Sequence, residues 1–143
     1  MSKTLVVLVI AALFLLWKFV LFPEKLDFTD KMKVLQGLTL AKSHKQAVLK
    51  FWQDRKVFPS QEQWLNEGPE MNVNLGNSIV SDIRVGEQSP GSITVYYSNA
   101  RDPNLAPQIS GKSLTLKPYE YNGKIEWSCK GNVPEEFLPR PCR

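Results

Sequence analysis

The hydrophobic period of this chain changes once, near Gly76, and no other feature of the sequence constrains the fold as much. Residues 27–52 carry apolar side chains at a spacing that fits one face of a helix. These positions are Phe28, Met32, Leu35, Leu38, Ala41, Val48 and Phe51. Because proline disfavours helical backbone in the residue before it, the helix is expected to end near Asp54, ahead of Pro59. The first part of the chain therefore predicts one long helix.

After Gly76 the apolar residues alternate with polar ones, which is the period of a strand. Four alternating segments follow one another, marked by Ile79, Ile83 and Val85, by Ile93, Val95 and Tyr97, by Leu114 and Leu116, and by Ile125 and Trp127. Residues 86–91 and the pair Asn122-Gly123 carry turn signals. Because no helical pattern lies between the strands, we expect an α+β fold in which the long helix packs on a four-stranded antiparallel sheet.

Two other segments show neither period. Residues 55–77 are rich in glycine and proline and are expected to connect the helix to the sheet, with Trp64 and Leu65 as anchors on the core. Residues 99–107 contain two prolines and are expected to form a polar loop.

The N-terminal residues 4–22 are apolar except for Thr4 and Lys18. A helix over this stretch is roughly long enough to cross a hydrocarbon core of ~30 Å. The stretch favours an uncleaved single-pass membrane anchor over residues 1–22, with residues 23–143 as one further domain. The alternatives are a cleaved signal peptide, although no small-x-small cleavage site follows, and a buried core helix.

The cysteine count bears on the compartment and on cofactors. Cys129 and Cys142 are the only cysteines, and with a membrane-targeting start they fit one disulfide in an oxidising compartment; two unrelated buried thiols are the alternative. The distribution of lysines favours the opposite orientation, with the C-terminal domain on the cytoplasmic side, because Lys18, Lys25, Lys31 and Lys33 follow most of the apolar stretch. This indication is weaker than that of the cysteines. Two cysteines and one histidine exclude a Cys₄ or Cys₂His₂ zinc site within the chain, and no cofactor is expected.

Four pieces of the sequence, in the right order, resemble the type IVa branch of the type IV pilins. They are residues 109–118, which read Ile-Ser-Gly-Lys-Ser-Leu-Thr-Leu-Lys-Pro, residues 125–129, Ile-Glu-Trp-Ser-Cys, residues 138–142, Leu-Pro-Arg-Pro-Cys, and the helix that ends ahead of Pro59. The resemblance implies the type IV pilin fold, with a long N-terminal helix on a four-stranded antiparallel sheet. It also implies that Cys129 pairs with Cys142 in a C-terminal disulfide loop.

The start of the chain departs from the pilin pattern. Pilins have a basic leader, a glycine after which the prepilin peptidase cuts, and a glutamate inside the apolar helix. Here the first glycine is Gly37 and the first acidic residue is Glu24, so we expect no such cut and no carboxylate in the apolar segment. The resemblance then implies a non-polymerising accessory protein of the bacterial inner membrane, with its C-terminal domain in the periplasm. Its expected partners are pilin subunits or inner-membrane pilus assembly proteins, whose filament production it would modulate.

Candidate partner-binding residues lie on the helix and on the loops beside it. They are Phe28, Leu35, Lys42, Lys45, Trp64 and Arg101. For Trp64, as for Trp52 and Trp127, simple core filling is the stronger alternative.

Three other functions stay open. An atypical minor pilin would enter the filament. A DNA-binding competence pilin would use basic residues of the helix and tail, namely Lys31, Lys33, Lys42, Lys45, Lys50, Arg140 and Arg143, although interleaved acids make a solvated face the simpler interpretation. A third is a protein that blocks phage or a toxin. An enzyme is not expected, because the single histidine, His44, lies among lysines and is expected to be solvated, and Glu135 and Glu136 are expected at the surface.

Overall fold

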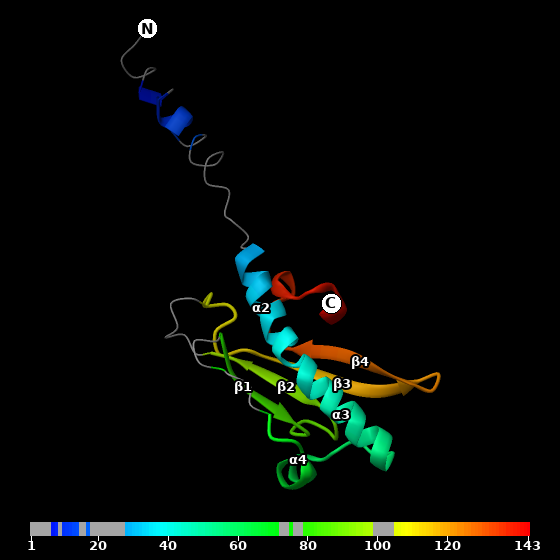
Figure 1. Cartoon of the computed structure of the whole chain (residues 1–143). Helices are drawn as coiled ribbons and strands as arrows, with labels where there is room; N and C mark the ends of the chain where they lie inside the picture. The colour runs from blue at the N-terminus through cyan, green and yellow to red at the C-terminus, as the bar shows by residue number, and fades with distance from the viewer. Residues whose placement is uncertain are drawn as a thin grey trace.

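The fold was analysed in a computed structural model that describes residues 7–8, 10–14, 17, 28–71, 75, 79–98 and 105–143. Figure 1 shows α2 (Phe28–Leu40) and α3 (Lys42–Arg55) in line, crossing one face of a sheet, with α4 (Gln61–Glu67) at one end. Much of the expected anchor and of the loop at residues 99–107 lies outside the described residues. None of the helices within the described residues combines the length and the apolar character needed to cross a membrane.

The long helix is present, with one irregularity at Ala41 between α2 and α3. The Ala41 amide donates to the Gly37 carbonyl at 3.2 Å, and the Lys45 amide donates to the Ala41 carbonyl at 3.0 Å. Helical hydrogen bonding therefore continues through this position. We call α2 and α3 together the stem. The stem ends at Lys56, whose φ of 58° is left-handed, one residue after the end of α3.

The side of the stem that faces the sheet differs in part from the predicted one. Its buried positions follow one another at alternating spacings of four and three residues, and we call this row the seam. The seam consists of Asp30, Val34, Gly37, Ala41, His44, Val48 and Phe51. Met32 and Leu35 were predicted on the apolar face, but they are 47% and 41% exposed and lie outside the seam.

The segment after the stem contains a helix that the sequence prediction missed. In α4 the Ser60 hydroxyl accepts a hydrogen bond from the Gln63 amide, and the Gln63 side chain accepts one from the Ser60 amide. This capping box satisfies two amides at the start of the helix. Trp64 packs against the core as predicted, but the prediction for Leu65 was wrong, because its side chain is 76% exposed.

Within the described residues the sheet has four antiparallel strands in the order β1-β2-β3-β4, as predicted. They are β1 (Val80–Val85), β2 (Ile93–Tyr97), β3 (Ser113–Tyr121) and β4 (Lys124–Gly131). The β3–β4 turn at Asn122 and Gly123 has φ of 50° and 73°, the signs that a two-residue type I′ hairpin requires. The register Tyr121↔Lys124 closes this hairpin.

The core lies between the seam and the inner face of the sheet. Ile93, Val95, Leu114 and Leu116 point to this side and are buried together with Val34 and Val48 of the seam. The hydroxyl of the buried Tyr97 donates to the Val34 carbonyl at 2.8 Å. Cys129 of β4 and Cys142 form the predicted disulfide, which holds the 3-10 helix η2 (Arg140–Cys142) beside β4. The stem, the sheet and the C-terminal loop thus share one core.

Candidate interaction surface

The stem has a second row of side chains that faces away from the sheet, and we call it the outer row. It repeats with the same alternation of three and four residues as the seam and consists of Met32, Leu35, Thr39, Lys42 and Gln46, all of them exposed. A helix presents different residues on its two sides with this period, so the outer row is the side of the stem that the sheet leaves uncovered. It is apolar at its N-terminal end and polar further along.

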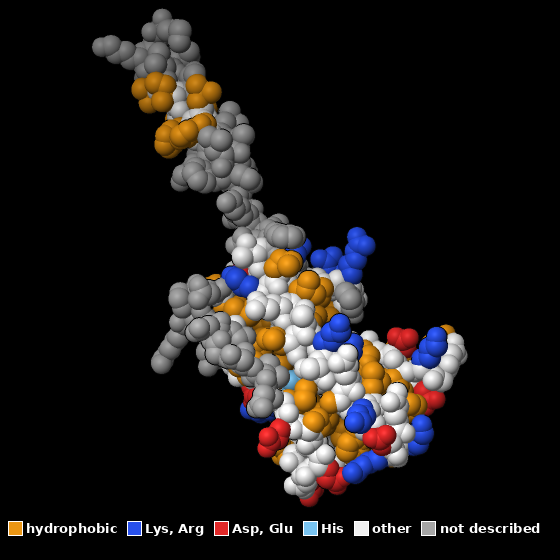
Figure 2. All heavy atoms as spheres, in the orientation of Figure 1, with side chains coloured by type: hydrophobic (Ala, Val, Ile, Leu, Met, Phe, Trp, Pro, Cys, Tyr) orange, Lys and Arg blue, Asp and Glu red, His pale blue; other side chains and the backbone are white. Residues whose placement is uncertain are grey.

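The apolar end of the outer row lines a shallow groove on α2. Its lining residues are Thr29, Met32, Lys33, Leu35, Gln36 and Thr39. Orange hydrophobic side chains are visible along this helix in the space-filling view of Figure 2. Lys33 lies at the edge of the groove, where its ammonium group donates to the Asp30 carboxylate at 3.0 Å. Two large apolar side chains are therefore open to solvent beside a charge pair.

The structure brings only two of the predicted contact residues into one row. Leu35 and Lys42 are seven residues apart in the outer row, which is about two helical turns, and both are exposed. Lys45 lies elsewhere, because its ammonium group is 4.9 Å from the ring centroid of Trp127 in β4. Partial burial lowers the pKa of Lys45, and the nearby Glu126 carboxylate opposes that shift. Lys45 therefore joins the stem to the sheet.

The remaining predicted contact residues do not extend this surface. Trp64 is partly buried against the core and leaves little of its ring for a partner. Phe28 begins α2, but its side chain lies outside the described part of the structure. Arg101 lies entirely outside the described residues. The sequence analysis did not identify Met32 as a surface residue. Its spacing of three residues from Leu35 is visible in the sequence, but the sequence does not show which side of the helix the sheet covers.

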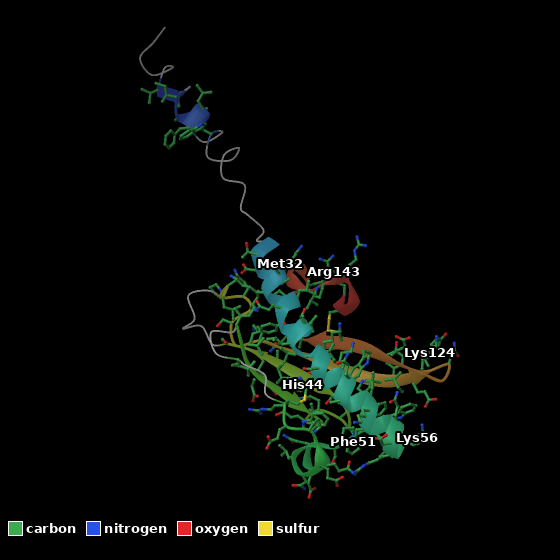
Figure 3. All side chains as sticks on the ribbon, viewed as in Figure 1. Met32, His44, Phe51, Lys56, Lys124 and Arg143 are labelled. Carbon is green, nitrogen blue, oxygen red and sulfur yellow. A yellow bond between two sulfur atoms is a disulfide. The ribbon has the colours of Figure 1, made fainter. Side chains whose placement is uncertain are left out.

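The prediction of a solvated His44 was wrong. Its side chain belongs to the seam and is 4% exposed; Figure 3 shows where it lies on α3. Desolvation lowers the pKa of His44, and the Leu40 carbonyl opposes this shift more weakly. Among the described atoms Nδ1 has no hydrogen-bond partner. Its lysine neighbours Lys42 and Lys45 misled the prediction, because adjacent positions on a helix point to different sides.

We next searched the described residues for a cluster of side chains that could bind a metal ion. They contain no group of three histidine, cysteine, aspartate or glutamate side chains placed to hold a metal ion. Charged side chains pair with one another at the surface, as Arg84 does with Asp82 at 2.7 Å and with Glu87 at 2.8 Å. The stem also exposes apolar side chains, Met32 and Leu35.

Comparisons with known proteins give the family. A model of the pilin family, described as a bacterial filament protein, matches residues 31–143. The chain is 25% identical to the fimbrial protein EcpC of Eikenella corrodens, over 85% of this chain and 75% of that protein. It is 21% identical to the type IV major pilin protein PilE of Neisseria gonorrhoeae, over 87% of this chain and 81% of that protein.

The matched region contains nearly the whole stem, the sheet and the disulfide. This is also the arrangement that the resemblance to type IV pilins implies, with a helix packed on a four-stranded antiparallel sheet and a C-terminal disulfide loop. The chain therefore belongs to the pilin family and has the type IV pilin fold.

Proposed function

We propose that this chain is a non-enzymatic accessory protein that binds pilin subunits, or inner-membrane pilus assembly proteins, and modulates pilus biogenesis. In this proposal residues 1–22 are a single-pass anchor in the bacterial inner membrane, and residues 23–143 form a domain in the periplasm. The disulfide between Cys129 and Cys142 supports an oxidising compartment for that domain.

The observation that carries the proposal is the exposed apolar end of the outer row. Met32 and Leu35 lie on a helix, beside a groove, and more than two fifths of each side chain is open to solvent. An exposed apolar stripe at helical spacing is a surface on which a second helix can pack. The family suggests that this helix is the stem of a pilin subunit.

The apolar N-terminal stretch supports an accessory role over a filament subunit. Residues 4–22 contain no aspartate or glutamate. A carboxylate is costly in hydrocarbon unless it is paired, and so it can set the register of neighbouring subunits. Without such a group the chain would associate with a pilin stem but would not template the next subunit. It would thus change the supply of assembly-competent pilin.

The proposal is tested by site-specific crosslinking in cells that make pili. A photoreactive amino acid at Leu35, in the full-length chain, is expected to capture pilin, because this side chain lies in the proposed contact. The same group at Asn66, an exposed position of α4, is the matched control and should capture none. Pilin captured equally at both positions, or at neither, would contradict the proposed contact.

Two substitutions connect the contact with filament production. With the photoreactive amino acid moved to Thr39 of the same row, Leu35→Asp is expected to reduce pilin capture about tenfold, which corresponds to a loss of about 1.4 kcal/mol of apolar burial. Gln46→Asp adds the same charge at the polar end of the outer row and should leave capture unchanged. The number of surface pili should change with Leu35→Asp alone. Recovery of the chain in sheared pili, at the abundance of a subunit, would instead identify it as a minor pilin.

A further inference from the structure

The β3–β4 hairpin extends beyond the rest of the sheet. The ladder between β2 and β3 ends at the pair Ile93↔Leu116, whereas the ladder between β3 and β4 continues to Tyr121↔Lys124. We call residues 115–130 the ribbon. Figure 1 shows its turn projecting past the other strands, and Figure 3 labels Lys124 at that end. Lys45 of the stem lies over Trp127 on its inner side, so the outer side is the one open to a ligand.

The register assigns the side chains of the ribbon to two faces. Leu114 and Leu116 are buried under the stem, so the odd-numbered residues of β3 point to the opposite, outer face. In agreement, the hydroxyl oxygens of Thr115 and Thr94 lie 3.1 Å apart on that face. With their partners on β4, the outer-face positions toward the turn are Lys117, Tyr119, Tyr121, Lys124, Glu126 and Ser128, and Lys130 lies opposite Thr115.

This outer face combines aromatic rings with positive charge. Tyr119 is 48% exposed and Tyr121 is 62% exposed, and they lie two residues apart on one strand, about 7 Å. Lys117, Lys124 and Lys130 are all exposed, and no ion pair occupies them within the described part of the chain. Among the ribbon positions of this face the one carboxylate is that of Glu126, which lies directly opposite Tyr119 and also acts on the charge of Lys45 in the stem.

We propose that the outer face of the ribbon binds an acidic polysaccharide. Sugar rings would pack on the two tyrosine rings, which offer flat apolar faces and a hydroxyl for hydrogen bonds. The lysines would attract the negative groups of the polymer. Glu126 accepts hydrogen bonds from hydroxyl groups, so an uncharged sugar fits over Tyr119 between the lysines on either side. This surface is separate from the stem, and the proposal does not depend on the accessory function.

The position of Glu126 favours a polysaccharide over a single-stranded nucleic acid. A nucleic acid strand stacked on both tyrosines would bring a phosphate past the carboxylate, and like charges at short range repel. A polysaccharide that carries a charge on every second sugar leaves a neutral unit at that point. Nucleic acid binding is therefore the competing outcome of the experiment.

The experiment measures binding of the full-length chain, purified in detergent micelles, to three polymers. Hyaluronan carries a carboxylate on every second sugar, dextran is neutral, and poly(dT) is a single-stranded nucleic acid. Hyaluronan is expected to bind more tightly than the other two. Raising NaCl from about 0.1 M to about 1 M, which shortens the Debye length from about 10 Å to about 3 Å, should weaken it. Tighter binding of poly(dT), equal binding of dextran, or no binding would overturn the proposal.

Two pairs of substitutions locate the binding site. Tyr119→Ala with Tyr121→Ala, and Lys117→Gln with Lys124→Gln, should each weaken hyaluronan binding about fivefold or more. These side chains are at the surface, so the fold should persist, and circular dichroism checks this. The control pair Lys50→Gln with Arg140→Gln removes the same charge from exposed positions outside the ribbon. Loss of binding in the control pair, or none in the ribbon variants, would overturn the proposal.

Discussion

At the scale of single residues, His44 is a titratable side chain held away from solvent. It is buried in the seam, and its Nδ1 has no hydrogen-bond partner among the described atoms. The Leu40 carbonyl acts on the ring, but desolvation has the larger effect on its pKa. Protonation would place a charge at this buried position, so the folded chain favours the neutral imidazole.

This burial predicts a dependence of stability on pH. The pKa of His44 in the fold lies below the ordinary value of 6.5, so below about pH 6.5 the unfolded chain binds a proton that the folded chain does not. The free energy of unfolding should therefore fall as the pH falls through this range. In His44→Leu the decrease in the free energy of unfolding that His44 causes at low pH should disappear. Urea unfolding at several pH values, followed by tryptophan fluorescence, measures it; an unchanged pH profile in the variant would refute this account.

Gly37 allows the stem to lie close to the sheet. A Cβ at this position would lie 2.7 Å from the Tyr97 hydroxyl and 2.8 Å from Cε1 of the same ring. The Tyr97 side chain is 2% exposed, and its hydroxyl donates a hydrogen bond to the Val34 carbonyl. The ring therefore has little room to move. Gly37→Ala is therefore expected to lower the free energy of unfolding by about 1–3 kcal/mol despite alanine's better helix propensity. Urea unfolding measures this, with Gln36→Ala as an exposed neighbour that should change little.

At the scale of elements, α4 depends on its capping box. Ser60→Ala removes the acceptor of the Gln63 amide and should lower the free energy of unfolding by about 1 kcal/mol. Asn66→Ala, an exposed substitution in the same helix, should change it by less than about 0.5 kcal/mol. Thermal or urea unfolding of the two variants gives the comparison. Equal effects would mean that the cap contributes nothing.

The start of α4 could have been predicted from the sequence, whereas its packing could not. Serine at position 60 followed by glutamine at position 63 is a capping-box pattern, and it was present in the segment that was assigned to a loop. Which of the neighbours Trp64 and Leu65 reaches the core depends on how the short helix is rotated. That rotation is set by its contact with β1, which no local pattern contains.

At the scale of the whole molecule, the disulfide fixes the C-terminal loop to the sheet. The cysteines are 13 positions apart, and a loop of this size restricts the unfolded chain enough to stabilise the fold by about 3 kcal/mol. Replacing both, Cys129→Ser with Cys142→Ser, should lower the free energy of unfolding by about that amount. Urea unfolding under non-reducing conditions is the measurement. The parent protein with reductant added should match the double variant, and a parent unaffected by reductant would contradict this expectation.

The general architecture followed from the sequence because each part has its own local signal. The single change of period separated the stem from the sheet, and Asn122-Gly123 located the β3–β4 turn. The side of the stem that is exposed could not be predicted from the sequence. Both the seam and the outer row contain apolar side chains at helical spacing. Which row is covered depends on the fit against the sheet, including the close approach of Tyr97 to Gly37. Leu35, a predicted contact residue, is exposed, as is Met32, which the sequence analysis did not propose; contact with a partner stays a prediction for both.

The strand order also bears on how the molecule folds. Each ladder of the described sheet joins two strands that are consecutive along the chain, so the sheet can form from neighbouring pieces without a long search. Contacts between residues close in sequence speed folding, since little loop entropy is lost before they form. We expect the docking of the stem onto the sheet, which joins segments farther apart in the sequence, to be the slower step. Burial of Tyr97 beneath Gly37 would report that step in a kinetic experiment.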